Sequence, residues 1–338
     1  MKKGLLIIGI VLFAVGCALA LFAFASEGFN PANFGVQYET NIRTVYPNFK
    51  RVKIEVGTSD VRIERSSDEE CRVVCLDSEK VTHQVYEIGT TLCVQQKDSR
   101  RWYDYIFSTL SFRSPNVIIY LPDDKYYTID VTTDTGDMFI SEDVTVDSIA
   151  VTTDTGDVEI DASAKTTISV KTNTGDIEVS GSTVEEVFLE SDTGDVEVSD
   201  MKIARELKVS TETGDIDIKA IKCTATMASA GSGDKTNTIH ISAVINVETE
   251  TGDVYFDDVL VSGNTNITTD TGDVELYGFE SSRTDITTDT GDVLVTFRKN
   301  KTVIATTRTG DIDVPEDMSG GNCYINTDTG DITVRIKK

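Results

Sequence analysis

Pairs of acidic residues recur through the sequence at a spacing that could hold a metal ion. Copies of the motif Thr-Asp-Thr-Gly-Asp, such as residues 133–137, place one carboxylate two residues before a glycine and another directly after it. Aspartate follows the glycine in all eleven copies, and the position two residues before it is acidic in eight. Carboxylate oxygens are the ligands that Ca²⁺ prefers, so these rows are candidates for calcium binding. The candidate ligands are Asp134, Asp137, Asp154, Asp157, Asp192, Asp195, Asp270, Asp273, Asp289 and Asp292.

The same acidic residues also have a purely structural interpretation. The aspartate after the glycine can hydrogen-bond the backbone of its own turn, while the acidic residue before the glycine stays hydrated. The glycine-rich nonapeptide of calcium-binding β-rolls is absent, and Asn173, Gly231 and Arg308 interrupt the acidic row without changing the spacing. We therefore favour the structural interpretation, in which the protein needs no cofactor, and keep calcium as the alternative.

If the repeated motif carried catalytic groups, we would expect them in a copy whose sequence departs from the regular pattern. One copy is irregular, ATMASAGSGDKTNTIHIS at residues 225–242, and it supplies Asp234, Lys235 and His240. It contains neither paired acids nor a nucleophile with its base. Walker, HExxH and GxSxG motifs are absent from the chain. We interpret the segment as a bulged or register-shifted copy, and we expect no enzymatic activity.

Cysteine chemistry offers little beyond packing. Cys71 and Cys75 are four residues apart, so on one strand they would lie about 13 Å apart, too far for a disulfide. Cys93 is the only nearby partner in the sequence. Metal sites favour CxxC spacing and histidines, but the chain has only two histidines. Packed or free thiols are the expected state of the cysteines beyond the N-terminal segment, which are Cys71, Cys75, Cys93, Cys223 and Cys323.

The even spacing of the motif predicts the elements that position these residues. Successive motif glycines are 19 or 20 residues apart, which is typical of a solenoid. Apolar residues seven and five positions before each glycine, and two and four after it, alternate as in strands. Glycine suits the corner between the two strands because it reaches positive φ without a clash. The motif glycines are Gly136, Gly156, Gly175, Gly194, Gly214, Gly233, Gly252, Gly272, Gly291, Gly310 and Gly330.

These patterns predict an all-β protein with a single β-solenoid of about eleven coils. Parallel strands prefer right-handed crossovers, so we expect the coils to wind in a right-handed sense. Coils would stack about 4.8 Å apart, which places equivalent residues in ladders. Continuing the alternation, the threonines three and one positions before each glycine should both point inward and hydrogen-bond along the stack.

The N-terminal segment is typical of a sequence that targets a protein to a membrane. Lys2 and Lys3 precede an uncharged run over residues 4–25, which is long enough as a helix to span about 30 Å of hydrocarbon. We therefore expect residues 1–25 to be a transmembrane anchor, with the body on the extracytoplasmic side. A small-x-small pattern at residues 23–25 makes secretion after signal cleavage the alternative, and a lipobox ending at Cys17 is a weaker one.

The rest of the chain divides into three predicted regions. Residues 26–47 resemble an extended linker, and residues 48–130 form a strand-rich cap or irregular first coils, since GTSDVRIE is a degenerate copy of the motif. Residues 131–338 form the TGD-repeat solenoid. The last strand, ITVRIKK, would end the stack with an open edge. The net charge is −26 and lies almost entirely after residue 130, which argues against nucleic-acid binding.

The arrangement of these segments resembles a known bacterial family. VKIEVGTSDVRIE at residues 52–64, TLCVQQ at 91–96, VIIYLPDD at 117–124 and the TxTGDVxI coils behind an N-terminal anchor are similar to the "putative adhesin" β-strand-repeat family of unknown function. The resemblance covers residues 48–338. It implies a β-solenoid on the outer side of a bacterial envelope, and it supplies no catalytic residues.

Together these interpretations predict a non-enzymatic surface protein of the cell envelope, acting as a scaffold or an adhesin-like binding module. Its expected partners are the membrane, through the N-terminal helix, and an envelope polymer or protein. A cation-binding surface protein or a carbohydrate-active enzyme is the alternative.

Overall fold

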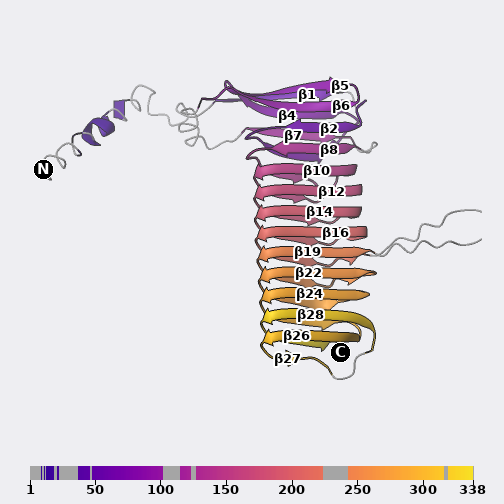
Figure 1. Ribbon diagram of the computed structural model, residues 1–338. Coiled ribbons are helices and arrows are strands. Elements are labelled where there is room, and N and C mark those ends of the chain that lie inside the picture. Colours follow the sequence, from indigo (N-terminus) through magenta and orange to yellow (C-terminus); the bar gives the residue numbers. More distant parts are fainter. Residues whose placement is uncertain are drawn as a thin grey trace, which may run out of the picture.

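A computed structural model shows two long sheets that face each other in a β-solenoid (Figure 1). The structure describes residues 9, 11, 13–18, 21–22, 37–45, 48–101, 115–122, 127–223, 243–315 and 319–337. Described residues between 9 and 22 are helical, but the described part of the chain contains no helix both long and apolar enough to cross a membrane. The all-β prediction is confirmed for the body.

Fifteen strands form one of the two sheets. In spatial order these are β26 (Lys301–Thr309), β28 (Gly321–Thr329), β24 (Arg283–Thr290), β22 (Asn264–Thr271), β19 (Val244–Thr251), β16 (Lys202–Thr213), β14 (Thr183–Thr193), β12 (Ser163–Thr174), β10 (Thr145–Thr155), β8 (Thr128–Thr133), β2 (Arg51–Glu55), β6 (Thr91–Asp98) and β5 (Val81–Ile88), while β18 (Lys222–Cys223) pairs with β16 and with β21 (Leu260–Val261).

Fourteen strands form the other sheet. Their spatial order is β1 (Tyr38–Val45), β4 (Cys71–Ser78), β7 (Asn116–Leu121), β3 (Asp60–Arg65), β9 (Met138–Ile140), β11 (Val158–Ile160), β13 (Ile177–Ser180), β15 (Val196–Ser199), β17 (Ile216–Lys219), β20 (Val254–Asp257), β23 (Val274–Phe279), β25 (Val293–Phe297), β29 (Ile332–Ile336) and β27 (Ile312–Asp313).

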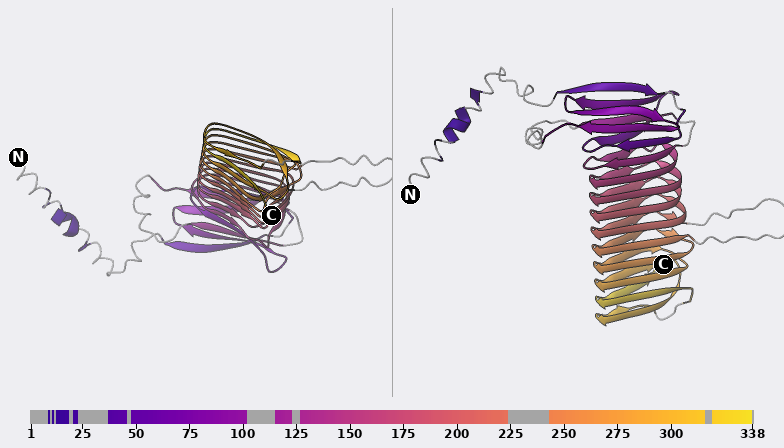
Figure 2. Two further views of the ribbon diagram at one scale, coloured as in Figure 1. Left: turned by 90° about the horizontal axis from the view of Figure 1, so that it is seen from below. Right: turned by 45° about the horizontal axis from the view of Figure 1, so that its top comes forward.

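Each coil buries one row of alternating residues from each sheet. In the coil formed by β12 and β13, Ile168, Val170, Ile177 and Val179 are at most 1% exposed. The strands pair parallel and in register, so Ile168 lies beside Val187 of the next coil. Equivalent residues therefore form continuous apolar ladders, and the view along the rod shows the coils superimposed (Figure 2). Because neither face of the core is open to water along the stack, the core is one cluster over its whole length.

The motif glycines form one column, as the spacing predicts. A Cβ atom built on Gly194 would lie 2.1 Å from the carbonyl oxygen of Gly175, and one built on Gly175 would lie 2.2 Å from that of Gly156. Such distances leave no room for a side chain. The φ of Gly194 is 148°, a region that other residues rarely adopt. Glycine is therefore required here by both backbone conformation and space.

The two threonines of the motif have different environments, which corrects the prediction that both point inward. The first is buried in most coils, and in several it donates to the glycine carbonyl of an adjacent coil, as Thr211 Oγ1 does to Gly194 O at 3.1 Å, whereas the Thr153 and Thr172 hydroxyls have no hydrogen-bond partner among the described residues. The second, such as Thr213, is exposed. The chain turns at the acidic residue between the two threonines, one position earlier than the alternation implies, so the second threonine leaves the core.

The corners at Gly214 and Gly252, which flank the irregular copy in the sequence, are direct neighbours. A Cβ atom on Gly252 would lie 1.9 Å from Gly214 O. β16 likewise pairs directly with β19, with Leu207 opposite Ile245. Residues 224–242, which include Gly233, Asp234, Lys235 and His240, lie outside the described residues. The bulged or register-shifted copy expected there stays a prediction.

The last two coils are stacked in reverse order. β28 pairs with β24 on one side and with β26 on the other, and β29 lies between β25 and β27 (Figure 1). The prediction that Ile332–Ile336 forms the open edge was therefore wrong. The end coil is formed by β26 and β27, whose Ile312 is 44% exposed, whereas Ile332 is fully buried. The inserted coil has the more apolar inward positions, which suits the enclosed place.

The opposite end is covered by antiparallel strands. The stack begins at β2 and β3, on which β6 and β7 pair in parallel. β5 then pairs antiparallel to β6, β4 pairs antiparallel to β7, and β1 pairs antiparallel to β4. All six cysteines are free, and four of the five beyond the N-terminal segment have thiols whose pKa burial raises to about 12. These thiols stay protonated and unreactive at neutral pH.

Candidate functional site

The aspartates that follow the glycines link neighbouring coils. The backbone N–H of Asp215 donates to Asp195 Oδ1 at 2.8 Å, and that of Asp195 donates to Asp176 Oδ1 at 2.8 Å. The same contact repeats from Asp60 at the first corner to Asp311 at the last. The sequence led us to expect a bond within the same turn. The acceptor instead serves the next coil, so one carboxylate oxygen in each coil already has a structural partner.

The acidic pairs proposed as calcium ligands lie on the surface of the corner column. Nine of the ten candidates are exposed, and Asp192 is half-buried. Across the described ranges of the chain, no three acidic, histidine or cysteine side chains are grouped as metal ligands. A calcium ion on the column would have to compete with the Oδ1 contacts between coils, so the alternative remains a prediction without a grouped ligand set.

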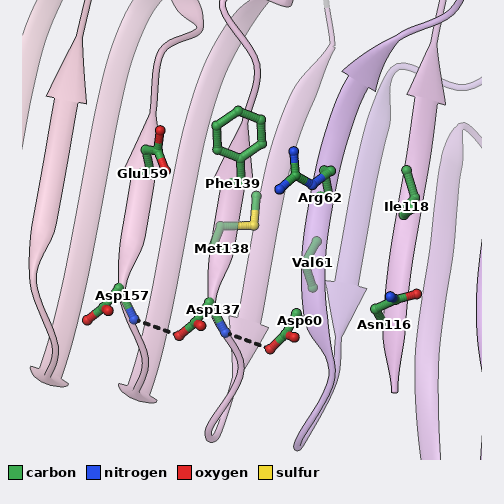
Figure 3. A pocket seen from close by; sticks show the side chains of 10 residues that line it. All are labelled: Asp60, Val61, Arg62, Asn116, Ile118, Asp137, Met138, Phe139, Asp157 and Glu159. Carbon is green, nitrogen blue, oxygen red and sulfur yellow. Dashed lines mark hydrogen bonds between the residues drawn. The ribbon is translucent and has the colours of Figure 1, made fainter. Parts of the chain in front are cut away.

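An open groove of about 430 Å³ lies where the first coils meet the cap. Asp60, Asp137 and Asp157 follow its edge at the starts of β3, β9 and β11, and their backbone-to-carboxylate bonds connect them in a row (Figure 3). Further along the same strands, the Arg62 guanidinium lies 4.3 Å from the centre of the Phe139 ring. The groove therefore has an acidic edge and a cationic, aromatic floor.

One carboxyl group of this groove, that of Asp60, has a raised pKa. Burial raises the pKa of the Asp60 carboxyl, and the nearby Asp137 carboxylate adds to that shift, whereas the hydrogen bond from Asp137 N lowers it. Asp60 is the first aspartate of the ladder and is covered by the cap, which explains why it is the most buried of the row. The arrangement can contact a cationic or polar chain, but it assembles no nucleophile with a base.

A second cluster, in the cap, has the geometry of a serine–histidine–aspartate triad. Ser59 Oγ lies 2.9 Å from His83 Nε2, and His83 Nδ1 lies 2.6 Å from Asp77 Oδ1. The His83 backbone N–H also donates to Asp77 Oδ1 at 3.1 Å, and Asn41 Nδ2 donates to Asp77 Oδ2 at 2.7 Å. Sequence reasoning missed this cluster because its members come from four strands and turns with no shared motif.

The cluster cannot act as a hydrolase in this arrangement. Ser59 is fully buried, so no carbonyl carbon can reach its Oγ. The Ser59 hydroxyl also lies 2.9 Å from Gln96 Oε1, a polar contact that a nucleophile awaiting substrate does not need. The three residues are better understood as a buried polar network that joins the cap to the first corner. We call Ser59, Asp77, His83 and Gln96 the cap network.

Comparisons with solved structures find distant likenesses only. A "putative cell adhesion protein" from Clostridium sporogenes is 10% identical over 89% of this chain and 100% of its own, with a TM-score of 0.24. A "putative lipid binding protein" from Parabacteroides distasonis is 12% identical over 88% and 98%, with a TM-score of 0.42. A "putative adhesin" from Bacteroides fragilis is 12% identical over 90% and 99%, with a TM-score of 0.28. Scores this low carry no functional information.

The family comparison is more direct. No curated protein matches the chain. The family model described as Toastrack DUF4097 matches residues 49–258 and 206–338, which together include the stack and all of the cap except β1. This confirms the resemblance that the strand motifs and TxTGDVxI coils indicate. The protein belongs to the Toastrack DUF4097 family.

Proposed function

We propose that the protein is a non-enzymatic surface protein of a bacterial envelope, which holds a stiff β-solenoid on the outer side of the membrane for adhesin-like binding or as a scaffold. The observation that carries this proposal is the polarity of the stack. β1, the first strand after the apolar N-terminal segment, lies at the capped end, while the uncapped coil of β26 and β27 lies at the other end. Fourteen strands at about 4.8 Å make a rod roughly 60 Å long.

Anchored through residues 1–25, such a rod would carry its open end away from the lipid. The closely stacked corners and the unbroken core support a stiff element, since each coil is bonded to both neighbours. Its long sides are flat and polar, which suits contact with a polymer or with another protein. The family assignment and the N-terminal segment support an envelope location.

One observation favours cation binding as a second function. Glu159, Glu178 and Glu197 stand directly beside one another on the outer face of β11, β13 and β15. Burial raises the pKa of Glu178, and repulsion from the carboxylates of Glu159 and Glu197 raises it further. A cationic ligand along this row would relieve that repulsion. We place this function second because the row is exposed and has no converging neutral ligands.

The proposal is tested with the full-length protein in detergent micelles, added to purified cell-wall fragments and to a glycan array. We expect retention on an envelope polymer or on a wall protein, with the glycan recovered at its original length. A variant with Gly194 replaced by valine, in which the column is disrupted, serves as the negative control and should lose retention. Shortened glycan would show catalysis and refute the non-enzymatic proposal, and equal retention of the control would refute a role for the solenoid.

A further inference from the structure

The cap network fixes the direction of every proton in it, starting at Gln96. The backbone N–H groups of Gly57 and Thr58 both point to Gln96 Oε1, at 2.9 and 3.1 Å. Gln96 Nε2 donates to Thr58 Oγ1 at 3.3 Å. The reverse orientation of the amide would direct its NH2 group at two other donors, so the oxygen must face the corner.

The orientation of the Gln96 amide determines which atom the Ser59 hydroxyl donates its proton to. Ser59 Oγ lies 2.9 Å from Gln96 Oε1, an atom that can only accept, so the single hydroxyl proton belongs to that contact. The other neighbour of Ser59 Oγ is His83 Nε2 at 2.9 Å. With its own proton already used, Ser59 can only accept from His83. His83 Nε2 must therefore carry a proton.

The second ring nitrogen needs a proton for an independent reason. His83 Nδ1 lies 2.6 Å from Asp77 Oδ1, a carboxylate that also accepts from the His83 backbone N–H and from Asn41 Nδ2. Three donors around one carboxyl group favour its ionised form. The His83 side chain is fully buried and that of Asp77 is 11% exposed, so a neutral ring would leave a nearly buried carboxylate without a counter-charge.

We infer that His83 carries both ring protons in the folded protein and forms a buried imidazolium–carboxylate pair with Asp77 that latches the cap onto the first corner. The network thus resembles a catalytic triad in distances, while its histidine cannot accept a proton from serine. The charged groups around it are Asp77 on β4, Asp60 next to Ser59, and the ion pair of Arg100 with Asp98, in which Arg100 Nη2 also donates to Thr58 Oγ1 at 2.7 Å. Asn41, Gln96 and Ser59 are its neutral neighbours.

The latch supplies a hydrogen-bond acceptor that a backbone carbonyl supplies in the coils. In the stack, the N–H of the residue before each motif glycine donates to the preceding coil, as Thr155 N does to Asp134 O at 2.8 Å. At the first corner, Thr58 N donates to Gln96 Oε1 of β6 instead. Ser59 Oγ and, through it, His83 hold Gln96 in place from the other side. The protonated ring therefore helps to fix β6, which pairs in parallel with β2, on the first corner.

Removing the latch should weaken the cap rather than the coils. The network joins Asp77 of β4, His83 of β5 and Ser59 at the first corner, whereas, among the described residues, the coils from β12 onward have no contact with it.

The direct test is nitrogen NMR of the full-length protein in detergent micelles, with ¹⁵N-labelled histidine and His240→Gln, which leaves His83 as the only histidine. At pH 7.5 we expect two protonated ring nitrogens, each with an attached-proton signal that exchanges slowly with water. One ring nitrogen with the shift of an unprotonated acceptor would overturn the inference.

A second measurement follows the cap itself. In His83→Gln, amides of β4 and β5 should lose at least about tenfold of their protection against hydrogen exchange relative to the parent protein, whereas amides of β12 and β14 should not change. If that variant fails to fold, the NMR measurement on His240→Gln still decides. Equal losses in the cap and in the coils would refute the latch.

Discussion

Replacing Gly194 by alanine is expected to destabilise the protein by at least about 3 kcal/mol, because the new methyl group has no space. Its Cβ would lie 2.1 Å from Gly175 O, 2.6 Å from Gly175 C and 3.1 Å from Asp176 Oδ1. Two of these atoms form the backbone carbonyl group of Gly175, whose oxygen accepts a hydrogen bond from Ser191 Oγ at 3.2 Å. The strain at a φ of 148° adds to the clash. Chemical denaturation of the full-length protein measures the loss.

Gly181→Ala is the matched control. Gly181 also has positive φ, 64°, but the nearest atom to its added Cβ would be Asp161 O at 3.7 Å, an ordinary contact. It should cost about 1 kcal/mol, the usual penalty for an L-residue in the left-handed region. Equal losses in the two variants would mean that only backbone conformation matters, and that the corners do not lie against each other.

Replacing Ile332 by aspartate is expected to cost about 4 kcal/mol, since it would bury a charge without a partner in the core of an enclosed coil. Ile332 is fully buried, between Val293 of β25 and Ile312 of β27. The sequence places it in the last coil, where such a change would be mild. The reversed order of the final coils is what makes the expected effect large.

Ile312→Asp is the control, because Ile312 has the same position in the motif. It belongs to the uncapped end coil and is 44% exposed, so the new carboxylate can remain hydrated. We expect a loss below about 1 kcal/mol. Urea unfolding of both variants decides the order of the coils. A larger loss for Ile312→Asp than for Ile332→Asp would place β27 inside the stack and β29 at its end.

Those features that each coil specifies locally could be predicted from the sequence. The apolar alternation around Gly175 and Gly194 predicts two strands and a corner in every coil, and these corners form a column as expected. The family follows from the same motifs. The prediction that the second threonine points inward was wrong. Period-two alternation fails where a strand bends into a corner, and Thr213 is exposed to water.

Features that depend on the choice among near-identical coils could not be predicted. The copies at Gly310 and Gly330 have almost the same sequence, so either could follow Gly291, and only the packing of whole coils places Gly330 there. Likewise, the even spacing of the motif does not predict that the corners at Gly214 and Gly252 are direct neighbours. The right-handed winding, the anchor and the calcium alternative stay predictions.

The candidate sites show the same division. The aspartate row was found from the repeat, because a repeated residue on a solenoid must form a line. The cap network was invisible, because Ser59, Asp77 and His83 converge only through antiparallel strands that follow no period. Burial and proton geometry, which give that network its role, exist only once the cap is folded.

The central claim is that the corners form one column in the order that the structure gives. Pulsed electron paramagnetic resonance tests it on the full-length protein with Cys17 replaced by serine and with spin labels on cysteines at position 154 and at either 308 or 328. With coils about 4.8 Å apart, the structure places position 328 seven coils and position 308 eight coils from position 154, or about 34 and 38 Å. We expect the shorter distance for the pair 154–328. A shorter distance for 154–308, as stacking in sequence order requires, would contradict it.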